Sequence, residues 1–366
     1  MKVTTKVNLN VRVGAPRLDA PCYQYIAPGS ELEVDGKLYT GDYFEGINTW
    51  MKDEAGNYYW SGGIVQKDAI AWRVSTKLIG NLPWWINKFG IDKIWDMGIT
   101  GKGIKVAVLD TGIGGNDNLR KENIDGFNFI LNNSDYSDLT NGHGTHIAGI
   151  IGGSGDQMVG LAPEVKLFIG KVVQADGKLD SQALINALHY CLDINVDIIN
   201  CSFIVSPAEF KKDLLLQNNL LPAIQNVVNH GIYITAACGN YAIPLDCYPA
   251  LYNECISVTA IDQTRNLFRD ACSSNTIDIS APGVEIFSTG LNNVCVYQSG
   301  TSQSAAYLAG FLALAKDCMN QKKKWSYGGL LNQLLDPANL TNSNLPLNQF
   351  GKGIINPLNI INSLSR

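Results

Sequence analysis

From Trp85 onward, short and continuously apolar runs alternate with longer segments of helical periodicity. A short run that is apolar throughout is typical of a strand buried on both faces, and apolar residues spaced three and four apart are typical of a helix packed on a sheet. The alternation therefore predicts an α/β domain with a mostly parallel sheet and crossover helices. The expected strands are 103–110, 196–200 and 232–237, and the expected helices are 181–192 and a segment within 208–230 that ends at Gly231.

Residues 1–70 follow a different pattern. Short alternating runs are separated by the turn sequences APG, DG, TGD and EAGN, and no helical period occurs. This pattern predicts a small all-β domain at 1–70, a linker at 71–84, and the α/β domain at 85–366. With 366 residues, 46% of them hydrophobic and 17% charged, the chain is long enough and apolar enough for one large and one small core.

Three fragments carry the chemistry: DTG at Asp110, HGTH at His143 and SGTSQSAA around Ser302. A serine hydroxyl is a weak nucleophile, so it needs an imidazole to take its proton and a carboxylate to orient that imidazole. Asp110 directly follows an expected buried strand, whereas His143 and Ser302 precede apolar helical segments. Since ligands of open α/β sheets bind at the carboxyl ends of strands, the three side chains are predicted to form a catalytic triad there.

Together with VGLAPEVKLFIGKVV, DIINCSF and FGKGIINP, these fragments resemble the subtilisin-type serine proteases over residues 85–366. The resemblance implies a three-layer α/β fold and a serine endopeptidase that works through an acyl-enzyme intermediate. It also implies that Asn240, at the end of the expected strand 232–237, holds the oxyanion together with the Ser302 amide. No cofactor is expected for this reaction. The partner is a peptide or protein substrate.

In that family, two extended backbone segments hold the substrate between them as an added strand. The corresponding positions, with those bordering the primary pocket, are Gly177, Lys178, Leu179, Ser202, Phe203, Ile204, Gly239, Asp246 and Cys247. A shallow apolar pocket that favours Leu, Met or Phe is the first expectation. An Asp246 carboxylate directed into the pocket is the alternative, and it would select Arg or Lys.

The chain departs from the family pattern in several places. Ser-Phe-Ile-Val at 202–205 replaces Ser-Leu-Gly-Gly, Gln-Ser-Ala-Ala at 303–306 replaces Met-Ala-x-Pro, and about eight extra residues precede Asn240. The loop before VGLAP is shorter than the family's calcium loop, so a structural calcium there is possible but unsupported. The nine cysteines lack metal-ligand spacing and are expected as buried hydrophobes, with a Cys247–Cys255 bridge as the alternative.

The strand order of residues 1–70 resembles a bacterial SH3 domain, whose aromatic side chains either fill the core or bind a peptide, glycan or cell-wall ligand. A net charge of −5 argues against nucleic acid or an anionic membrane as the main partner. The N-terminus lacks an apolar signal segment, which favours a cytoplasmic protein. Export with a signal that is absent from this sequence is the alternative.

Two other function classes fit parts of the sequence. A pseudo-protease would bind peptide ends or cell-wall fragments without hydrolysis, but all four catalytic positions are intact, and labelling of Ser302 by a fluorophosphonate would decide. A ligating enzyme would let an amine outcompete water for the acyl-enzyme. Such enzymes carry a cap over the cleft, for which eight extra residues are too few, and the mass of the product would decide.

Overall fold

The computed structural model describes residues 2–5, 7–27, 30–35, 37–44, 47–66, 82–322, 326–341 and 345–365. The chain divides into two compact units, Met1–Arg73 and Val74–Arg366. Most of the expected linker, residues 71–84, lies outside the described residues. Its last residue, Trp84, begins helix α1.

The first unit is all β. A three-stranded sheet has the order β4-β1-β8, a five-stranded sheet has the order β3-β2-β7-β6-β5, and every pairing is antiparallel. Its small core includes Val3, Trp50 and Trp60. The strands are β1 (Lys2–Thr5), β2 (Leu9–Val13), β3 (Cys22–Ile26), β4 (Glu31–Glu33), β5 (Tyr39–Phe44), β6 (Ile47–Lys52), β7 (Asn57–Trp60) and β8 (Ile64–Gln66).

The second unit contains a seven-stranded sheet of order β10-β11-β9-β12-β13-β14-β15, in which all neighbours are parallel. Its order reverses at β9, so that β11 and β10 extend to one side and β12 to β15 to the other. The strands, with the hairpin β16–β17, are β9 (Lys105–Asp110), β10 (Ile124–Asn128), β11 (Lys166–Lys171), β12 (Ile198–Cys201), β13 (Tyr233–Ala237), β14 (Ile256–Ile261), β15 (Ile279–Pro282), β16 (Ile286–Thr289) and β17 (Cys295–Gln298).

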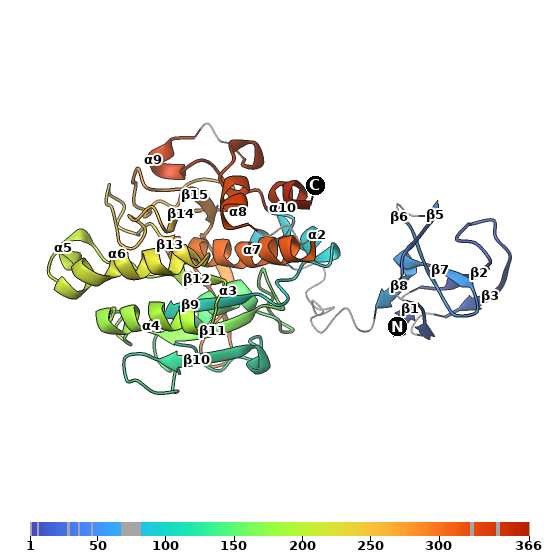
Figure 1. The fold of residues 1–366 in the computed structure, drawn as a ribbon, viewed down its shortest axis with the longest axis horizontal. Coiled ribbons are helices and arrows are strands. Elements are labelled where there is room, and N and C mark those ends of the chain that lie inside the picture. The colour runs from blue at the N-terminus through green and yellow to red at the C-terminus, as the bar shows by residue number, and fades with distance from the viewer. Residues whose placement is uncertain are drawn as a thin grey trace. The chain divides into compact units, whose positions relative to one another are not determined.

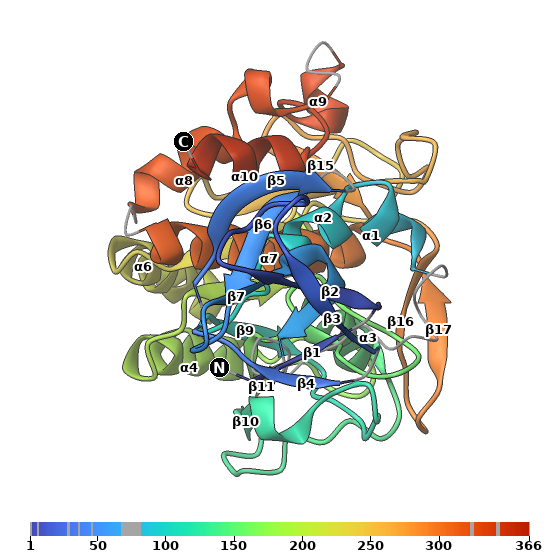
Figure 2. The same cartoon turned by 90° about the vertical axis from the view of Figure 1, so that its right-hand side faces the viewer.

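Helices cover both faces of this sheet (Figure 1, Figure 2). Helices α3 and α7 pack on one face, and α4 and α6 pack together on the other. The helices are α1 (Trp84–Asn87), α2 (Ile91–Asp96), α3 (His143–Gly152), α4 (Ser181–Asp193), α5 (Pro207–Phe210), α6 (Leu214–Asn229), α7 (Thr301–Lys322), α8 (Tyr327–Leu334), α9 (Leu347–Phe350) and α10 (Pro357–Ser365). The predicted three-layer α/β fold with a parallel sheet is confirmed.

Helix α7 is the central helix of the domain. Every residue from Thr301 to Met319 is buried, which agrees with the continuously apolar run in its middle, 305–315. Small residues such as Ala305, Ala309 and Gly310 let it pass close to its neighbours, and a Cβ on Gly310 would lie 2.9 Å from the Leu161 side chain. Since its first turn contains Ser302, this packing holds the serine firmly against the sheet.

Candidate active site

Asp110 ends strand β9, at the point where the strand order reverses. A ligand crevice of an open α/β sheet is expected at such a switch point, outside the carboxyl ends of the strands. The Asp110 side chain is 1% exposed, and its Oδ1 accepts a 2.8 Å hydrogen bond from the Thr111 amide. A buried carboxylate needs hydrogen-bond partners. The Thr111 amide and a histidine imidazole, described next, hold the Asp110 carboxylate in one orientation.

That imidazole belongs to His143, the first residue of α3. Its Nδ1 lies 2.8 Å from Asp110 Oδ1 and 3.0 Å from Oδ2, and its side chain is 29% exposed. Close approach of α3 to β9 depends on Gly144, where a Cβ would lie 2.2 Å from the Gly112 carbonyl oxygen. Burial disfavours the imidazolium, but the Asp110 carboxylate, with a smaller contribution from Asp138, outweighs it and raises the pKa of His143.

A second buried carboxylate, Asp138, stabilises the segments that position Asp110 and His143. Its Oδ2 accepts hydrogen bonds from Thr111 Oγ1 (2.6 Å) and the Gly142 amide (2.8 Å), and its Oδ1 accepts from the Thr140 and Asn141 amides. Burial alone would raise the pKa of Asp138, but these donors lower it, so the group is ionised. Asp138 therefore fixes the loop that enters α3. Sequence reasoning missed it, although an Asp a few residues before Gly-His is a typical loop cap.

Ser302 lies in the first turn of α7 and is 9% exposed. Its hydroxyl donates to the Ser202 carbonyl at 2.9 Å, and the Ser202 hydroxyl donates back to the Ser302 carbonyl at 2.8 Å. This reciprocal pair joins the start of α7 to the segment that follows β12. No hydrogen bond between Ser302 and His143 is present within the described ranges.

Asn240 follows strand β13 and faces the same helix terminus. Its Oδ1 accepts 2.9 Å hydrogen bonds from the Thr301 amide and the Thr301 hydroxyl, and Thr301 Oγ1 also accepts from the Gly239 amide at 3.2 Å. Because the oxygen is occupied in this way, the Nδ2 group is left to donate elsewhere. Thr301 thus orients Asn240. It is a site residue that sequence reasoning did not identify, since a threonine in this turn has no distinctive pattern.

A hollow of about 350 Å³ opens beside Asp110 and His143, and Ser302 and Asn240 are not among its lining residues. Five of its lining residues carry the sequence predictions for substrate contacts: Gly177, Leu179, Ser202, Phe203 and Ile204. Asp110 and His143 line it too, together with Glu209 and Tyr241. An adjoining hollow of about 550 Å³ shares Gly177, Leu179, Ile204 and Glu209, and it also contains Lys178. The structure therefore brings one predicted substrate segment, Gly177–Leu179, and the other, Ser202–Ile204, to one cleft.

Comparison with known proteins agrees with this geometry. Residues 101–353 match the subtilase family. The major intracellular serine protease of Bacillus subtilis (strain 168) is 33% identical over 271 residues, covering 70% of this chain and 82% of that protein. Subtilisin BL of Lederbergia lenta is 31% identical over 278 residues, covering 75% and 97%. The minor extracellular protease Epr of B. subtilis (strain 168) is 33% identical over 238 residues, and the match spans 64% of this chain and 35% of Epr.

The chain belongs to the subtilase family. The predicted family is confirmed, and with it the class of reaction: this subtilase is a serine endopeptidase acting on peptide bonds of peptides or proteins. The relatives are named as both extracellular and intracellular enzymes. In the described part of this subtilase, no helix combines the length and apolar character needed to cross a membrane.

The residues predicted to border the primary pocket differ in burial: Cys247 is buried, whereas Asp246 is exposed. Gly239 adopts φ +118°, and a Cβ there would lie 2.8 Å from Cys272 Sγ and 3.0 Å from Cys247 Sγ. Both thiols are buried, and burial raises the pKa of Cys247 to about 12, so that it stays a neutral thiol. Asp246 is exposed, and its carboxylate accepts a hydrogen bond from the Ser274 hydroxyl. Cys247 and Cys255 are not joined by a disulfide, so the alternative of a Cys247–Cys255 bridge is wrong for this structure.

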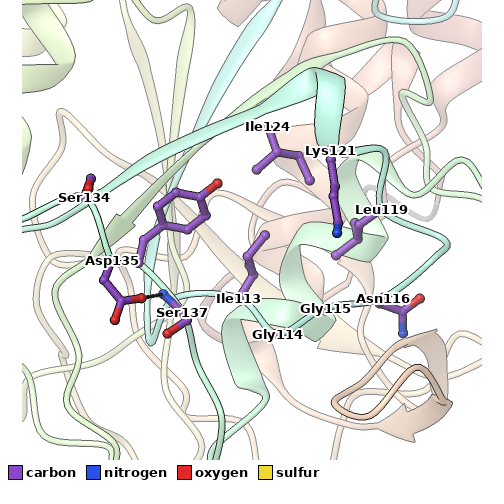
Figure 3. Close-up of a pocket in the computed structure, with 11 residues that line it drawn as sticks. Ile113, Gly114, Gly115, Asn116, Leu119, Lys121, Ile124, Ser134, Asp135 and Ser137 are labelled. Atoms are coloured by element: carbon purple, nitrogen blue, oxygen red, sulfur yellow. Dashed lines mark hydrogen bonds between the residues drawn. The ribbon is translucent and has the colours of Figure 1, made fainter.

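A third hollow, of about 370 Å³, lies between residues 113–124 and 134–137 (Figure 3). Ile113, Leu119 and Ile124 give it apolar walls, and Lys121 borders it. It is similar in size to the catalytic cleft but contains none of the predicted triad residues. Volume alone therefore does not single out the candidate site, whereas the Asp110–His143 contact distinguishes its cleft from this hollow.

The other three histidines lie outside this chemistry. His146 is fully buried, its Nε2 lies 3.1 Å from the Ile286 carbonyl and 3.2 Å from the Val296 carbonyl, and burial lowers its pKa to about 4. The neutral His146 imidazole donates from Nε2 to the hairpin β16–β17 and so connects α3 to both of its strands. His189 and His230 are exposed on α4 and at the end of α6.

The loop at 154–158, where the sequence left a structural calcium possible, is closed by Asn118. Asn118 is 3% exposed, and its Oδ1 accepts from the Gln157 amide at 2.9 Å and the Met158 amide at 3.1 Å. A carbonyl oxygen that already accepts two N–H groups is a poor calcium ligand, so the Asn118 side chain does not fit a cation at this loop. Across the described ranges, no group of three or more His, Cys, Asp or Glu side chains is arranged to hold a metal ion.

Proposed function

We propose that this endopeptidase uses Ser302 as nucleophile, His143 as general base, Asp110 as the residue that orients His143, and Asn240 as an oxyanion donor. The observation that carries the assignment is the 2.8 Å contact between Asp110 and His143 on the wall of a cleft whose other wall includes Ser202, the hydrogen-bond partner of Ser302. The proposed reaction uses these side chains, the Ser302 backbone amide and a water molecule.

In the first half of the reaction, the bond from Ser302 Oγ to the peptide carbonyl carbon forms while His143 Nε2 takes the hydroxyl proton. Negative charge then develops on the carbonyl oxygen, where Asn240 Nδ2 and the Ser302 amide donate. Collapse of this intermediate breaks the C–N bond as His143 returns its proton to the leaving amine. Water repeats the sequence on the acyl-enzyme, which releases the acid and restores Ser302.

The resting hydrogen bond of Ser302 implies one rearrangement before attack. The hydroxyl donates to the Ser202 carbonyl in the free enzyme, so it must turn toward His143 Nε2 when substrate is bound. Catalytic hydrogen bonds are often unformed in free enzymes and tighten in the substrate complex. The position of Ser302 at the start of a buried 22-residue helix favours the anion that forms next to it.

The substrate backbone is proposed to lie between Gly177–Leu179 and Ser202–Ile204. A turn closed by Gly177, with φ +86°, returns the chain so that Leu179 pairs with Val173. On the opposite side, Val205 pairs with Tyr248. Both segments are thus fixed at their bases, which supports their use as preformed edges for an added strand. Gly239 and Cys247 are proposed to border the primary pocket, where buried thiols favour an apolar side chain.

The test is hydrolysis of a casein-derived peptide library by wild type and by Ser302→Ala. The assignment predicts that Ser302→Ala loses nearly all turnover while it still binds peptide. A variant that keeps more than a few per cent of wild-type kcat with its fold intact, checked by circular dichroism, would assign the nucleophile to another residue. Ser304→Ala, two positions further along the same buried helix, is the matched control and keeps its activity.

We propose further that residues 1–70 form a separate SH3-like binding domain and that residues 85–366 carry the peptidase. A hollow of about 400 Å³ in the first unit has Trp50, Trp60, Phe44 and Arg12 among its lining residues. Aromatic faces with a guanidinium suit a peptide, a glycan or a cell-wall fragment. Binding of residues 1–70, expressed alone, to purified peptidoglycan would support this role. Retention by neither peptidoglycan nor a peptide array would refute it.

A further inference from the structure

Glu209 contributes an unassigned charge to the catalytic cleft. It lines both the 350 Å³ cleft and the adjoining 550 Å³ hollow, so it lies where the two meet. The other carboxylate in the cleft, Asp110, is 1% exposed and faces His143. Glu209 is exposed, which makes it the acidic group that an incoming side chain can reach.

The local fold holds this carboxylate in place. Ser206-Pro-Ala-Glu forms a capping box at the start of α5, in which Glu209 Oε2 accepts from the Ser206 amide at 2.9 Å and the Ser206 hydroxyl at 2.7 Å. These two donors lower the pKa of Glu209. Only Oε2 is used in the capping box, so the second oxygen remains for a ligand.

Tyr241 lines the same cleft as Glu209 and links it to the proposed reaction centre. Burial raises the pKa of the Tyr241 hydroxyl, and the negative charge of Glu209 raises it further. Tyr241 directly follows Asn240, which is proposed to hold the carbonyl oxygen of the bond being cleaved. Gly177, Leu179 and Ile204, from the segments proposed to hold the substrate backbone, line the same two hollows, so Glu209 borders the path proposed for the substrate.

We propose that Glu209 is a specificity-determining residue that selects a lysine or arginine side chain at one position on the acyl side of the scissile bond. This inference rests on the proposed catalytic assignment. Lys178 and Lys212 line the adjoining hollow. Their charge opposes a second cation further along the groove, so the preference is confined to a single position. The apolar walls formed by Phe203 and Ile204 accommodate the aliphatic stem of that side chain.

The experiment profiles a peptide library that varies each acyl-side position, using wild type, Glu209→Gln and two controls. Glutamine keeps the capping box and removes only the charge. Wild type is expected to prefer Lys or Arg over Gln at one acyl-side position by about twofold to fivefold in kcat/KM, the upper range of an exposed charge pair. Glu209→Gln should abolish that preference while kcat for a peptide with Leu there stays within about twofold.

The controls are Asp213→Asn and Asp246→Asn. Asp213 lines the adjoining hollow and caps α6, where its carboxylate is taken by the Leu216 amide and the Ser181 hydroxyl. Asp246 is the alternative acidic determinant from the sequence. Both variants should keep the basic preference. A preference that is absent in wild type, that survives in Glu209→Gln, or that disappears in Asp246→Asn would overturn the proposal. If wild type and Ser302→Ala hydrolyse the library equally, the catalytic assignment fails instead.

Discussion

The two walls of the catalytic cleft are built in different ways. On the wall of β9 and α3, Asp110 and His143 stand at the ends of regular elements. The buried side chains of Asp138 and Thr111 hydrogen-bond to each other and accept from the backbone amides beside His143, which fixes this wall. On the opposite wall, the segment after β12 and helix α5 offer half-buried or exposed side chains such as Phe203 and Glu209. The first wall can fix reaction geometry, whereas the second can vary its side chains without disturbing the sheet.

Removing the proposed reacting groups, Ser302 and His143, is the strongest test of the difference between the two walls. Ser302→Ala and His143→Ala are each expected to lower kcat by roughly 10⁶-fold, a magnitude that derives from measurements on subtilisin itself. Because the residues act as a unit, the double variant should lose no more than either single variant. Turnover of the three variants, measured with active-site-titrated wild type as reference, checks this. A double variant that loses far more than either single one would contradict the triad.

Asn240 tests whether the start of α7 belongs to the fixed part of the site. Asn240→Ala should lower kcat by about 10²- to 10³-fold with little change in KM, since the amide acts only on the developing oxyanion; this range also comes from subtilisin. Steady-state kinetics with one peptide substrate measure both constants. An effect confined to KM would move Asn240 from the oxyanion role to substrate binding.

The pH profile tests the electrostatics of the Asp110–His143 pair. The pKa of His143 is raised, and the base acts only when neutral, so kcat/KM should rise with pH through a value above that of an ordinary histidine. Asp110→Asn removes the charge that raises the pKa, so the residual activity should rise at lower pH. Rates of both enzymes from about pH 5 to 9 give the two profiles. A flat wild-type profile, or a limb that stays in place in Asp110→Asn, would exclude His143 as the base.

The smallest effect is expected away from the cleft, at the loop closed by Asn118. Asn118→Ala leaves the Gln157 and Met158 amides without their acceptor, which should lower the free energy of unfolding by about 1–3 kcal/mol. Urea denaturation measures this change, and kcat should stay within about twofold of wild type. Because Asn118 closes this loop, a calcium chelator should leave the urea midpoint of wild type unchanged. If EGTA destabilises wild type but not Asn118→Ala, a cation rather than the side chain closes the loop.

The sequence predicted the first wall better than the second. Continuous apolar runs such as 103–110 and 232–237 specify buried strands whatever surrounds them, so the sheet and the places of Asp110 and Asn240 at strand ends followed directly. The contacts of Thr301, Asp138 and Asn118 depend on which short polar side chains meet across distant loops, and no local pattern encodes that. Glu209 could have been found from the sequence, because Ser-Pro-Ala-Glu is a capping-box pattern that predicts a short helix directly after Phe203 and Ile204.

The most direct measurement is active-site labelling with a fluorophosphonate, followed by peptide mapping in a mass spectrometer. The reagent reacts only with a serine whose proton is taken by a neighbouring base and whose oxyanion is stabilised. The account predicts one stoichiometric adduct on Ser302, strongly reduced in His143→Ala. An unlabelled protein that still hydrolyses peptides, or an adduct on any other residue, would contradict it.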